Sequence, residues 1–459
     1  MTTELRDYQH AMIAGIRDHW RKGARRVLAV APTGSGKTHL MARATAQALD
    51  RGRKVGIVVH RRELLNQAVR AVTGHGVPAD HPRLTITTIQ SAHRTTLDDL
   101  DLLIVDEAHL ALARTWRAFI DRQRRAYVLG LTATPYRLDG RGLGEMFCAI
   151  VVGPQVLNLV ARGVLVPART FAPSVPDLDG VATVAGDWDR EGLAKAMMRP
   201  RIVGSIIDHY QRLAGGRQAI VFGTTIAHSK MLCEAFNAAG ITATHIDGST
   251  PHRERDAVIE AFRGGQGQVL TSCNVLSEGL DLPAVSAIIL ARPTQSEVIY
   301  RQQIGRGSRA CAGKADFVIL DHAGNALRHG LYATPKTHTL EGRRKPAKER
   351  QAPTESVRQC MTCYGVYESR AGACPYCGAV PPVKKRQTRE IAGELVELND
   401  DGKLETGWYR RVMRSIWTSP REQWERRLAQ MAIDQGYKAG WVHHQIEMRT
   451  FGPKGVVRR

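Results

Sequence analysis

Short apolar runs alternate with helical stretches from about residue 24 to residue 325, and this alternation limits the fold more than any other feature. Most of the runs are continuously apolar and rich in β-branched residues, as is typical of strands covered on both faces. Strands that alternate with helices predict βαβ units and therefore parallel sheets. The expected strands lie at 27–32, 54–60, 84–90, 102–109 and 126–134, and again at 219–224, 245–249, 268–272, 287–292 and 316–324.

The length of 459 residues exceeds what a single hydrophobic core supports, which indicates several domains. We expect two α/β domains, each built on a parallel sheet, followed by a small cysteine module and a helical tail. Prolines between the two sets of strands predict a connector there. The predicted boundaries are 1–165 for the first domain, 166–200 for the connector, 201–335 for the second domain, 336–356 for a basic linker, 357–382 for the cysteine module and 383–459 for a basic, tryptophan-rich, mainly helical region.

The chain carries 65 Lys and Arg residues against 44 Asp and Glu residues, which gives a formal net charge of +21. This excess suits a polyanionic partner, and nucleic acid is the commonest one. A hydrophobic fraction of 43% excludes wholesale disorder. No apolar run reaches the ~18–20 residues that a membrane helix needs, and the N-terminus lacks the pattern of a secretory signal. We therefore expect a cytoplasmic protein that has no membrane partner.

The sequence APTGSGKT at 31–38 follows an apolar run and precedes a stretch of good helix formers. This context predicts a phosphate-binding loop for ATP, whereas the alternative is an ordinary glycine turn before a helix. Gly34 and Gly36 would let backbone N–H groups point at phosphate oxygens. Lys37 would reach the β- and γ-phosphates, and the Thr38 hydroxyl would bind Mg²⁺. The candidate nucleotide-binding residues of this loop are Pro32, Thr33, Gly34, Ser35, Gly36, Lys37 and Thr38.

A second apolar run, LLIVDEAH at 102–109, contains Asp106 and Glu107. The carboxyl ends of parallel strands face the crevice in which open α/β sheets bind ligands. Asp106 would hold Mg²⁺ through water, and Glu107 would orient the attacking water as a general base. An isolated Asp-Glu pair is more commonly a solvated helix start. Together with the phosphate loop, this pair predicts ATP hydrolysis.

The phosphate loop and the DEAH sequence, in this order, resemble the motor of superfamily 2 helicases. The resemblance implies two tandem RecA-like domains and assigns functions to further motifs. LRDYQ at 5–9 is similar to the element that contacts adenine, while VLSEGLDLP at 275–283 and QQIGRGSR at 302–309 are similar to the coupling motif and the arginine motif. The residues that these motifs carry over are Arg6, Gln9, Gly279, Asp281, Gln302, Arg306 and Arg309.

Four more motifs resemble helicase elements that contact nucleic acid or couple hydrolysis to its binding. They are HRRELLNQ at 60–67, TTIQS at 87–91, TATP at 132–135 and FGTTIAHS at 222–229. Together with the histidine of the DEAH sequence, they imply such contacts for His60, Arg61, Arg62, Thr88, Gln90, Ser91, His109, Thr132, Thr134 and Thr224.

The arginine motif has a mechanical implication. An arginine that reaches the γ-phosphoryl group from another domain typically accelerates its transfer by ~10³–10⁵. Arg306 and Arg309 follow the second set of strands and are far from Lys37 in the sequence. Catalysis should therefore require the two domains to close on ATP. Closing and opening while holding a nucleic-acid strand would convert hydrolysis into movement.

Three further stretches look like bacterial and phage DNA-repair helicases of the RadD type: 130–144, 289–309 and 318–330. This resemblance implies an ATP-dependent DNA helicase or translocase for replication, recombination or repair, in a bacterial cell or a phage-infected host. It would bind and move along single-stranded or branched DNA. Two alternatives stay open: an RNA-directed ATPase of the same superfamily, and a non-unwinding recombination accessory factor whose DNA affinity is switched by ATP.

Four of the eight cysteines follow the pattern C-x₂-C-x₁₀-C-x₂-C, as Cys360, Cys363, Cys374 and Cys377. Two facing knuckles of this kind would place four thiolates around Zn²⁺. The module is too short for an apolar core, so metal binding must supply much of its folding free energy. Structural zinc is favoured over disulfides, which are rare in the cytosol, and over a redox pair. Because four thiolates leave no coordination position open, we expect the zinc to be structural and not catalytic.

The tail contains one clear helix signal at 418–436, with Ser419 as the expected cap and Gly436 at the end. Tryptophans around this segment alternate with basic residues. This pattern fits base stacking with phosphate neutralisation, but it favours a small helical domain whose tryptophans form the core; both hold if a basic exterior covers an aromatic interior. Either arrangement could also bind a replication or recombination protein.

Overall fold

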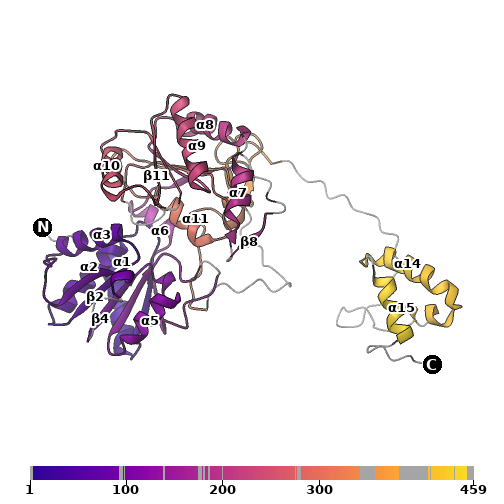
Figure 1. Cartoon of the computed structure of the whole chain (residues 1–459), viewed down its shortest axis with the longest axis horizontal. Helices are drawn as coiled ribbons and strands as arrows, with labels where there is room; N and C mark the ends of the chain where they lie inside the picture. The colour runs from indigo at the N-terminus through magenta and orange to yellow at the C-terminus, as the bar shows by residue number, and fades with distance from the viewer. Residues whose placement is uncertain are drawn as a thin grey trace. The chain divides into compact units, whose positions relative to one another are not determined.

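In the computed structural model the chain forms two compact units, Met1–Pro382 and Val383–Arg459 (Figure 1). The structure describes residues 4–92, 97, 99–137, 140–173, 178, 181–184, 187–198, 200–273, 275–276, 281–341, 357–381, 412–413, 415–438 and 440–451. Among these residues, no helix combines the length and the apolar character that crossing a lipid bilayer requires.

The first sheet has six parallel strands in the order β3-β2-β4-β5-β1-β6. They are β1 (Arg26–Val30), β2 (Val55–Val59), β3 (Leu84–Thr88), β4 (Leu102–Asp106), β5 (Tyr127–Thr132) and β6 (Ala149–Val152). The helices of this domain are α1 (Asp7–Arg21), α2 (Lys37–Leu49), α3 (Arg62–Gly74), α4 (Ile89–Ala92), η1 (Ala108–Leu110), α5 (Arg114–Arg122) and α6 (Val156–Ala161). β6 was not predicted, although the chain is continuously apolar from Met146 to Val152; the strand itself is short and only partly buried.

The second sheet also has six parallel strands, in the order β11-β12-β10-β13-β14-β7. They are β7 (Ala168–Phe171), β10 (Ala219–Phe222), β11 (Ala243–Ile246), β12 (Val269–Ser272), β13 (Ala287–Leu290) and β14 (Phe317–Asp321). The helices are α7 (Arg190–Met197), α8 (Pro200–Ala214), α9 (Ile226–Ala238), α10 (His252–Arg263), α11 (Glu297–Ile304) and α12 (Asn325–His329), and a small hairpin joins β8 (Thr183–Val184) to β9 (Asp187–Trp188). The predicted α/β fold with two parallel sheets is confirmed.

The segment predicted as a connector, 166–200, contains β7, which pairs with β14 as the outermost strand of the second sheet. The prolines in this segment end β7 and do not exclude it from the sheet. The segment therefore contributes directly to the second domain, in addition to joining the two sheets.

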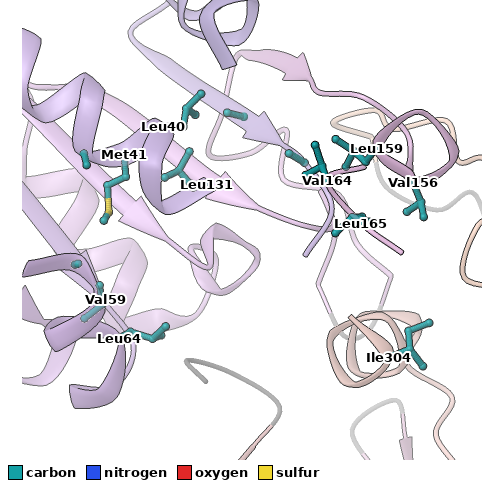
Figure 2. Close-up of a cluster of buried hydrophobic side chains, with 14 of the residues drawn as sticks. Leu40, Met41, Val59, Leu64, Leu131, Val156, Leu159, Val164, Leu165 and Ile304 are labelled. Carbon is teal, nitrogen blue, oxygen red and sulfur yellow. The ribbon is translucent and has the colours of Figure 1, made fainter. Parts of the chain in front are cut away.

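One buried apolar cluster extends from the first domain into the second (Figure 2). Leu40 and Leu131 come from the first domain, Leu159 from α6, Leu165 from the segment after α6, and Ile304 from α11. The residues between the two sheets are therefore part of a shared core.

The chain returns to the first domain after it leaves the second. Gln155 Nε2 donates a hydrogen bond to Lys336 O (2.9 Å), and Lys336 N donates one to Gln155 Oε1 (3.1 Å). Gly144 N donates to Leu340 O (2.9 Å), and the Leu340 side chain packs against a buried cluster of the first domain. The first residues of the predicted basic linker, 336–341, are thus bound to this domain, while 342–356 lie outside the described residues.

The C-terminal unit contains η2 (Arg421–Gln423), α14 (Trp424–Gln435) and α15 (Trp441–Phe451). The prediction that Ser419 caps the helix is wrong, because its hydroxyl donates back to Ile416 O (2.6 Å) and the helical segment begins after Pro420. Gly436 ends α14 with a φ of 66°, as predicted.

Tryptophans of the C-terminal unit contribute to its core. Trp417, Trp424 and Trp441 pack against a cluster that contains the buried Leu428 and Met431. This packing favours the interpretation of the tail as a small helical domain over an array of exposed stacking residues. Trp408, which belongs to the same sequence pattern, lies outside the described residues.

Gly130 in β5 provides a test of how tightly the turn after β4 packs on the sheet. A Cβ at Gly130 would lie 2.4 Å from Phe147 Cζ and 2.9 Å from Ala108 Cβ. We expect Gly130→Ala to lower the free energy of unfolding by about 1–3 kcal/mol through overpacking. Chemical denaturation of the purified variant measures this loss.

Gly204→Ala is the matched control. Gly204 lies in α8, and no atom lies within 4 Å of the position that its Cβ would take. Because alanine favours helices more than glycine does, this substitution should stabilise the protein by about 0.5–1 kcal/mol. Equal effects of the two substitutions would contradict the packing described here.

Candidate nucleotide-binding and zinc sites

The phosphate loop at 31–36 joins β1 to α2, in the strand–loop–helix context that the sequence predicts. Gly34 and Gly36 have φ values of 84° and 83°, in the left-handed region that favours glycine. α2 begins at Lys37, so the N–H groups of its first turn are available to an anion in the loop. The backbone of this loop therefore fits phosphate oxygens.

The Lys37 side chain folds back over the loop. Its Nζ donates hydrogen bonds to the carbonyl oxygens of Ala31 (3.0 Å) and Pro32 (3.3 Å). Burial lowers the pKa of Lys37, while the carboxylates of Glu107 and Asp106 raise it in part. Phosphate oxygens could replace the two carbonyl partners, because they are stronger acceptors for an ammonium group.

α1 begins beside the loop and bonds to it. Gln9 Nε2 donates to the carbonyl oxygens of Ser35 (3.3 Å) and Gly36 (3.2 Å), and Gln9 Oε1 accepts from Arg6 N (2.9 Å). The structure thus places the two candidate adenine-contacting residues next to the phosphate loop. Tyr8 was not predicted, yet its hydroxyl donates to Ser35 O (2.6 Å). Its position beside Gln9 in the sequence was the available signal.

Asp106 ends β4, and Glu107 follows with a φ of 50°, which is unusual for a residue other than glycine. Asp106 Oδ1 accepts a hydrogen bond from Glu107 N (3.0 Å), and Glu107 Oε2 lies 3.2 Å from His109 Nδ1. Burial raises the pKa of Glu107, but the hydrogen bond and charge of His109, with the charges of Lys37 and Arg306, outweigh it and lower this pKa to about 2. Glu107 is therefore ionised at neutral pH.

The turn at 305–309, here called the arginine turn, reaches the phosphate loop from the second domain. A Cβ on Gly305 would lie 2.6 Å from Thr33 Cβ, and a Cβ on Gly34 would lie 3.4 Å from Arg309 Cγ. Asp281 Oδ1 lies 3.0 Å from Arg309 Nη1. The structure therefore brings together candidate residues that are far apart in the sequence.

Gln302 and Arg306 complete this group and are 5% and 6% exposed. Both Arg306 and Arg309 act to lower the pKa of Lys37, which agrees with their position close to the phosphate loop. Thr38 lies in the first turn of α2. Gly279 lies outside the described residues.

The candidate nucleic-acid residues all lie at or after the carboxyl ends of strands, namely β2, β3, β4, β5 and β10. Their exposure divides them into two groups. Thr88, His109, Thr132, Thr134 and Thr224 are buried, whereas Arg62, Gln90 and Ser91 are exposed and His60 and Arg61 are partly exposed. The second group can contact a strand directly, and the first can act only through its neighbours.

Bonds within the buried group fix the loops after the strands. Thr132 Oγ1 donates to Thr134 O (2.9 Å) and accepts from Thr134 N (3.1 Å). In the second domain, the backbone N–H of Thr224 donates to His228 Nδ1 (3.3 Å), and the Thr224 hydroxyl lies 2.5 Å from the same atom. His228 was not predicted, although it stands one helical turn after Thr224.

The four clustered cysteines lie close enough to share one metal ion, with all Sγ atoms within 4.8 Å of one another. Cys360 Sγ lies 3.6 Å from Cys377 Sγ, and Cys363 Sγ lies 3.6 Å from Cys374 Sγ. A tetrahedral zinc site with Zn–S bonds of ~2.3 Å has Sγ atoms about 3.8 Å apart, so the cluster fits Zn²⁺. Cys360 and Cys363 lie in the turn between the antiparallel strands β15 (Val357–Gln359) and β16 (Val366–Glu368), and Cys374 and Cys377 follow β16.

The cysteine module is attached to the second domain along β7. Ala172 N donates to Tyr364 O (3.0 Å), and Phe171 forms an antiparallel bridge with Gly365. The Phe171 and Tyr376 rings pack with centroids 5.2 Å apart. Because β7 is the outermost strand of its sheet, the module covers an edge that would otherwise be open.

The cysteine cluster yields a metal prediction. Purified protein should contain about one equivalent of zinc, and Cys374→Ser should lose it. Because zinc supplies about 10–16 kcal/mol to small modules of this kind, the loss should also lower the melting temperature. Cys148→Ser is the control, because Cys148 is exposed and lies outside the cluster. Zinc retained by Cys374→Ser, or lost by Cys148→Ser, would refute the assignment.

Two buried histidines of the second domain predict a loss of stability in mild acid. Burial lowers the pKa of His228 to about 4 and that of His322 to about 3. The unfolded chain binds these protons first, so stability falls from about pH 6.5 towards the folded values, by about 1.4 kcal/mol per pH unit for each histidine.

Denaturation between pH 7.5 and pH 5 tests this dependence. His322→Asn should reduce the slope by about 1.4 kcal/mol per pH unit, because one buried proton acceptor is removed. His10→Gln, at an exposed position, should leave the slope unchanged. An unaltered slope in His322→Asn would show that another group causes the acid sensitivity.

Two family models match the chain. The model described as "Type III restriction enzyme, res subunit" matches residues 2–137, and the model described as "Helicase conserved C-terminal domain" matches residues 201–311. The first range contains the phosphate loop with Asp106 and Glu107, and the second contains the arginine turn.

Relatives extend over more of the chain. The 51.5 kDa protein of Lactococcus phage (isolate 7-9) is 30% identical over 374 residues, which cover 80% of this chain and 81% of the phage protein. The protein of Saccharomyces cerevisiae named "Putative ATP-dependent helicase IRC3" is 27% identical over 72% of this chain and 53% of its own length. XPB of Kineococcus radiotolerans, named as a DNA 3'-5' helicase, is 30% identical over 45% of this chain and 37% of its own length. The chain thus spans about half the length of the yeast relative.

Proposed function

The chain belongs to the superfamily 2 helicases and is an ATP-hydrolysing nucleic-acid helicase, and we propose that it moves on DNA during replication, recombination or repair. The net charge of +21 suits binding to the phosphate backbone of DNA, although it suits RNA as well. The relative XPB carries the name of a DNA helicase, which favours DNA. An RNA-directed ATPase is the alternative that the experiment below distinguishes.

The phosphate loop and the end of β4 supply the groups that bind ATP. Lys37 transfers its hydrogen bonds from the loop carbonyls to the β- and γ-phosphates. The Thr38 hydroxyl and the Asp106 carboxylate are oxygen ligands of the kind that Mg²⁺ prefers. When bound, this ion would neutralise phosphate charge. Glu107, which is ionised at neutral pH, accepts a hydrogen bond from the attacking water and orients it.

The arginine turn supplies the remaining charge. Arg306 and Arg309 stabilise the negative charge that develops as the γ-phosphoryl group leaves. Gln302 lies buried in the last turn of α11, just before the arginine turn. Arg309 is held by Asp281 before it engages a phosphate.

One observation carries the proposal most strongly: the arginine turn packs on the phosphate loop, through Gly305 against Thr33 and through Arg309 against Gly34. Groups needed for hydrolysis therefore come from both domains. A nucleotide at this junction would favour closure, and loss of its terminal phosphate would favour opening. The exposed Arg62, Gln90 and Ser91 are the proposed strand contacts of the first domain.

The rate of ATP hydrolysis in the presence of three nucleic acids tests which of them the protein uses. Single-stranded DNA, duplex DNA and RNA are compared at one fixed salt concentration, because salt alone changes such affinities by orders of magnitude. We expect DNA to stimulate turnover more than RNA does. Glu107→Gln should lower kcat by about 10²–10⁴, and Lys37→Ala should abolish turnover. Stimulation by RNA alone would favour the alternative, and full turnover by Lys37→Ala would refute the assigned site.

A strand-displacement assay separates unwinding from switching, with Glu107→Gln as the inactive control. Displacement by the wild type alone supports a helicase that unwinds. Hydrolysis without displacement would instead favour an accessory factor whose affinity for DNA is switched by ATP.

A further inference from the structure

Leu165 lies where the arginine turn meets the phosphate loop. Its backbone forms an antiparallel bridge with Arg309, and the next residue, Val166, donates its N–H to Ser308 O (2.8 Å). The Leu165 side chain is 1% exposed, and its Cδ2 would lie 2.8 Å from a Cβ built on Gly34. Leu165 therefore contacts the loop of one domain through its side chain and the arginine turn of the other through its backbone.

Arg309 is held at two points. The bridge to Leu165 fixes its backbone, and Asp281 Oδ1 holds its guanidinium at 3.0 Å. Between these points, its Cγ lies 3.4 Å from the Cβ position of Gly34. The packing of Leu165 against Gly34 therefore sets the distance between Arg309 and the phosphate loop.

Leu165 itself is firmly placed. Its backbone N–H donates to Leu159 O (3.2 Å), and both leucines belong to the buried cluster shared by the two domains (Figure 2). Beyond Leu165 the chain continues towards β7, and Pro167 O, just before that strand, accepts a hydrogen bond from Phe317 N (3.0 Å). A residue fixed on both sides in this way can transmit the position of one domain to the other.

We propose that Leu165 is a positioning residue for Arg309. Its side chain acts as a spacer against Gly34, and its backbone keeps Arg309 in register with the site of the γ-phosphate. Leu165 carries no polar side-chain group, so it acts through Arg309 and not on the nucleotide. The inference rests on the proposed function, because that function assigns Arg309 its task in hydrolysis.

Leu165→Ala in the full-length protein tests the proposal. It removes the atoms that contact Gly34 and leaves the backbone bridge possible. Since a misplacement of about 1 Å can lower a rate by about 10²-fold, we expect kcat for ATP to fall about 10- to 100-fold, while KM changes little. A steady-state ATPase assay with saturating DNA gives both constants.

Leu270→Ala is the matched control. Leu270 is also fully buried in the shared cluster, but it lies in β12 of the second domain and does not hold Leu165 in place. It should lower the melting temperature by a similar amount and leave kcat close to that of the wild type. Equal kcat losses in the two variants would overturn the proposal, because they would reflect a general loss of packing.

A binding measurement provides a readout that packing alone would not change. ADP with aluminium fluoride mimics the transferring phosphoryl group, which Arg309 should contact, whereas ADP lacks that group. Leu165→Ala should weaken binding of ADP with aluminium fluoride about 10-fold or more and leave ADP binding unchanged. Should Leu165→Ala fail to fold, Leu165→Val serves instead and should give a smaller loss of the same kind. Unchanged binding of the mimic by a folded variant would overturn the proposal.

Arg309→Ala separates failure of this inference from failure of the proposed function. If Arg309→Ala hydrolyses ATP at the wild-type rate, the proposed task of Arg309 is wrong and the inference falls with it. If Arg309→Ala lowers kcat strongly while Leu165→Ala matches Leu270→Ala, only the inference is wrong. In the expected case, adding Leu165→Ala to Arg309→Ala causes no further loss of kcat, because both act through one group.

Discussion

The arginine turn packs against the phosphate loop, and this contact gathers charges from two domains around one small volume. Lys37, Arg306 and Arg309 repel one another there, and the two arginines therefore lower the pKa of Lys37. The carboxylates of Glu107, Asp106 and Asp281 balance them in this structure. A nucleoside triphosphate would bring more negative charge to the same place, so its arrival and cleavage should change the balance between attraction and repulsion across the domain boundary.

The sheets could be predicted from the sequence because most of their strands are buried on both faces and therefore continuously apolar. Two edge strands were not predicted. β6 lies in an apolar run, but it is short and only partly buried, and β7 is short and lies among prolines in a segment that also joins the domains. The packing of edge strands depends on neighbours that are distant in the chain, and the local pattern does not record those neighbours.

Much of the candidate site could also be predicted, since the phosphate loop and the arginine motif are short and their residue types follow from phosphate chemistry. The structure places Gln9, Lys37, Glu107 and Arg309 around one loop, while their functions remain predictions. The contribution of Leu165 could not be anticipated, because a buried leucine carries no chemical signature. The attachment of the cysteine module to β7 could not be predicted either, because it depends on backbone bonds between segments that are distant in the sequence.

The chain crosses between the two domains twice, once through the segment after α6 and again through residues 336–341, which return to the first domain. A single tether would let one domain swivel in any direction relative to the other. Two attachments restrict that freedom, because the domains can then separate only by motions that keep both segments in place. Opening of the nucleotide site should therefore be confined to a narrow range of directions, and successive cycles of hydrolysis should displace the domains alike.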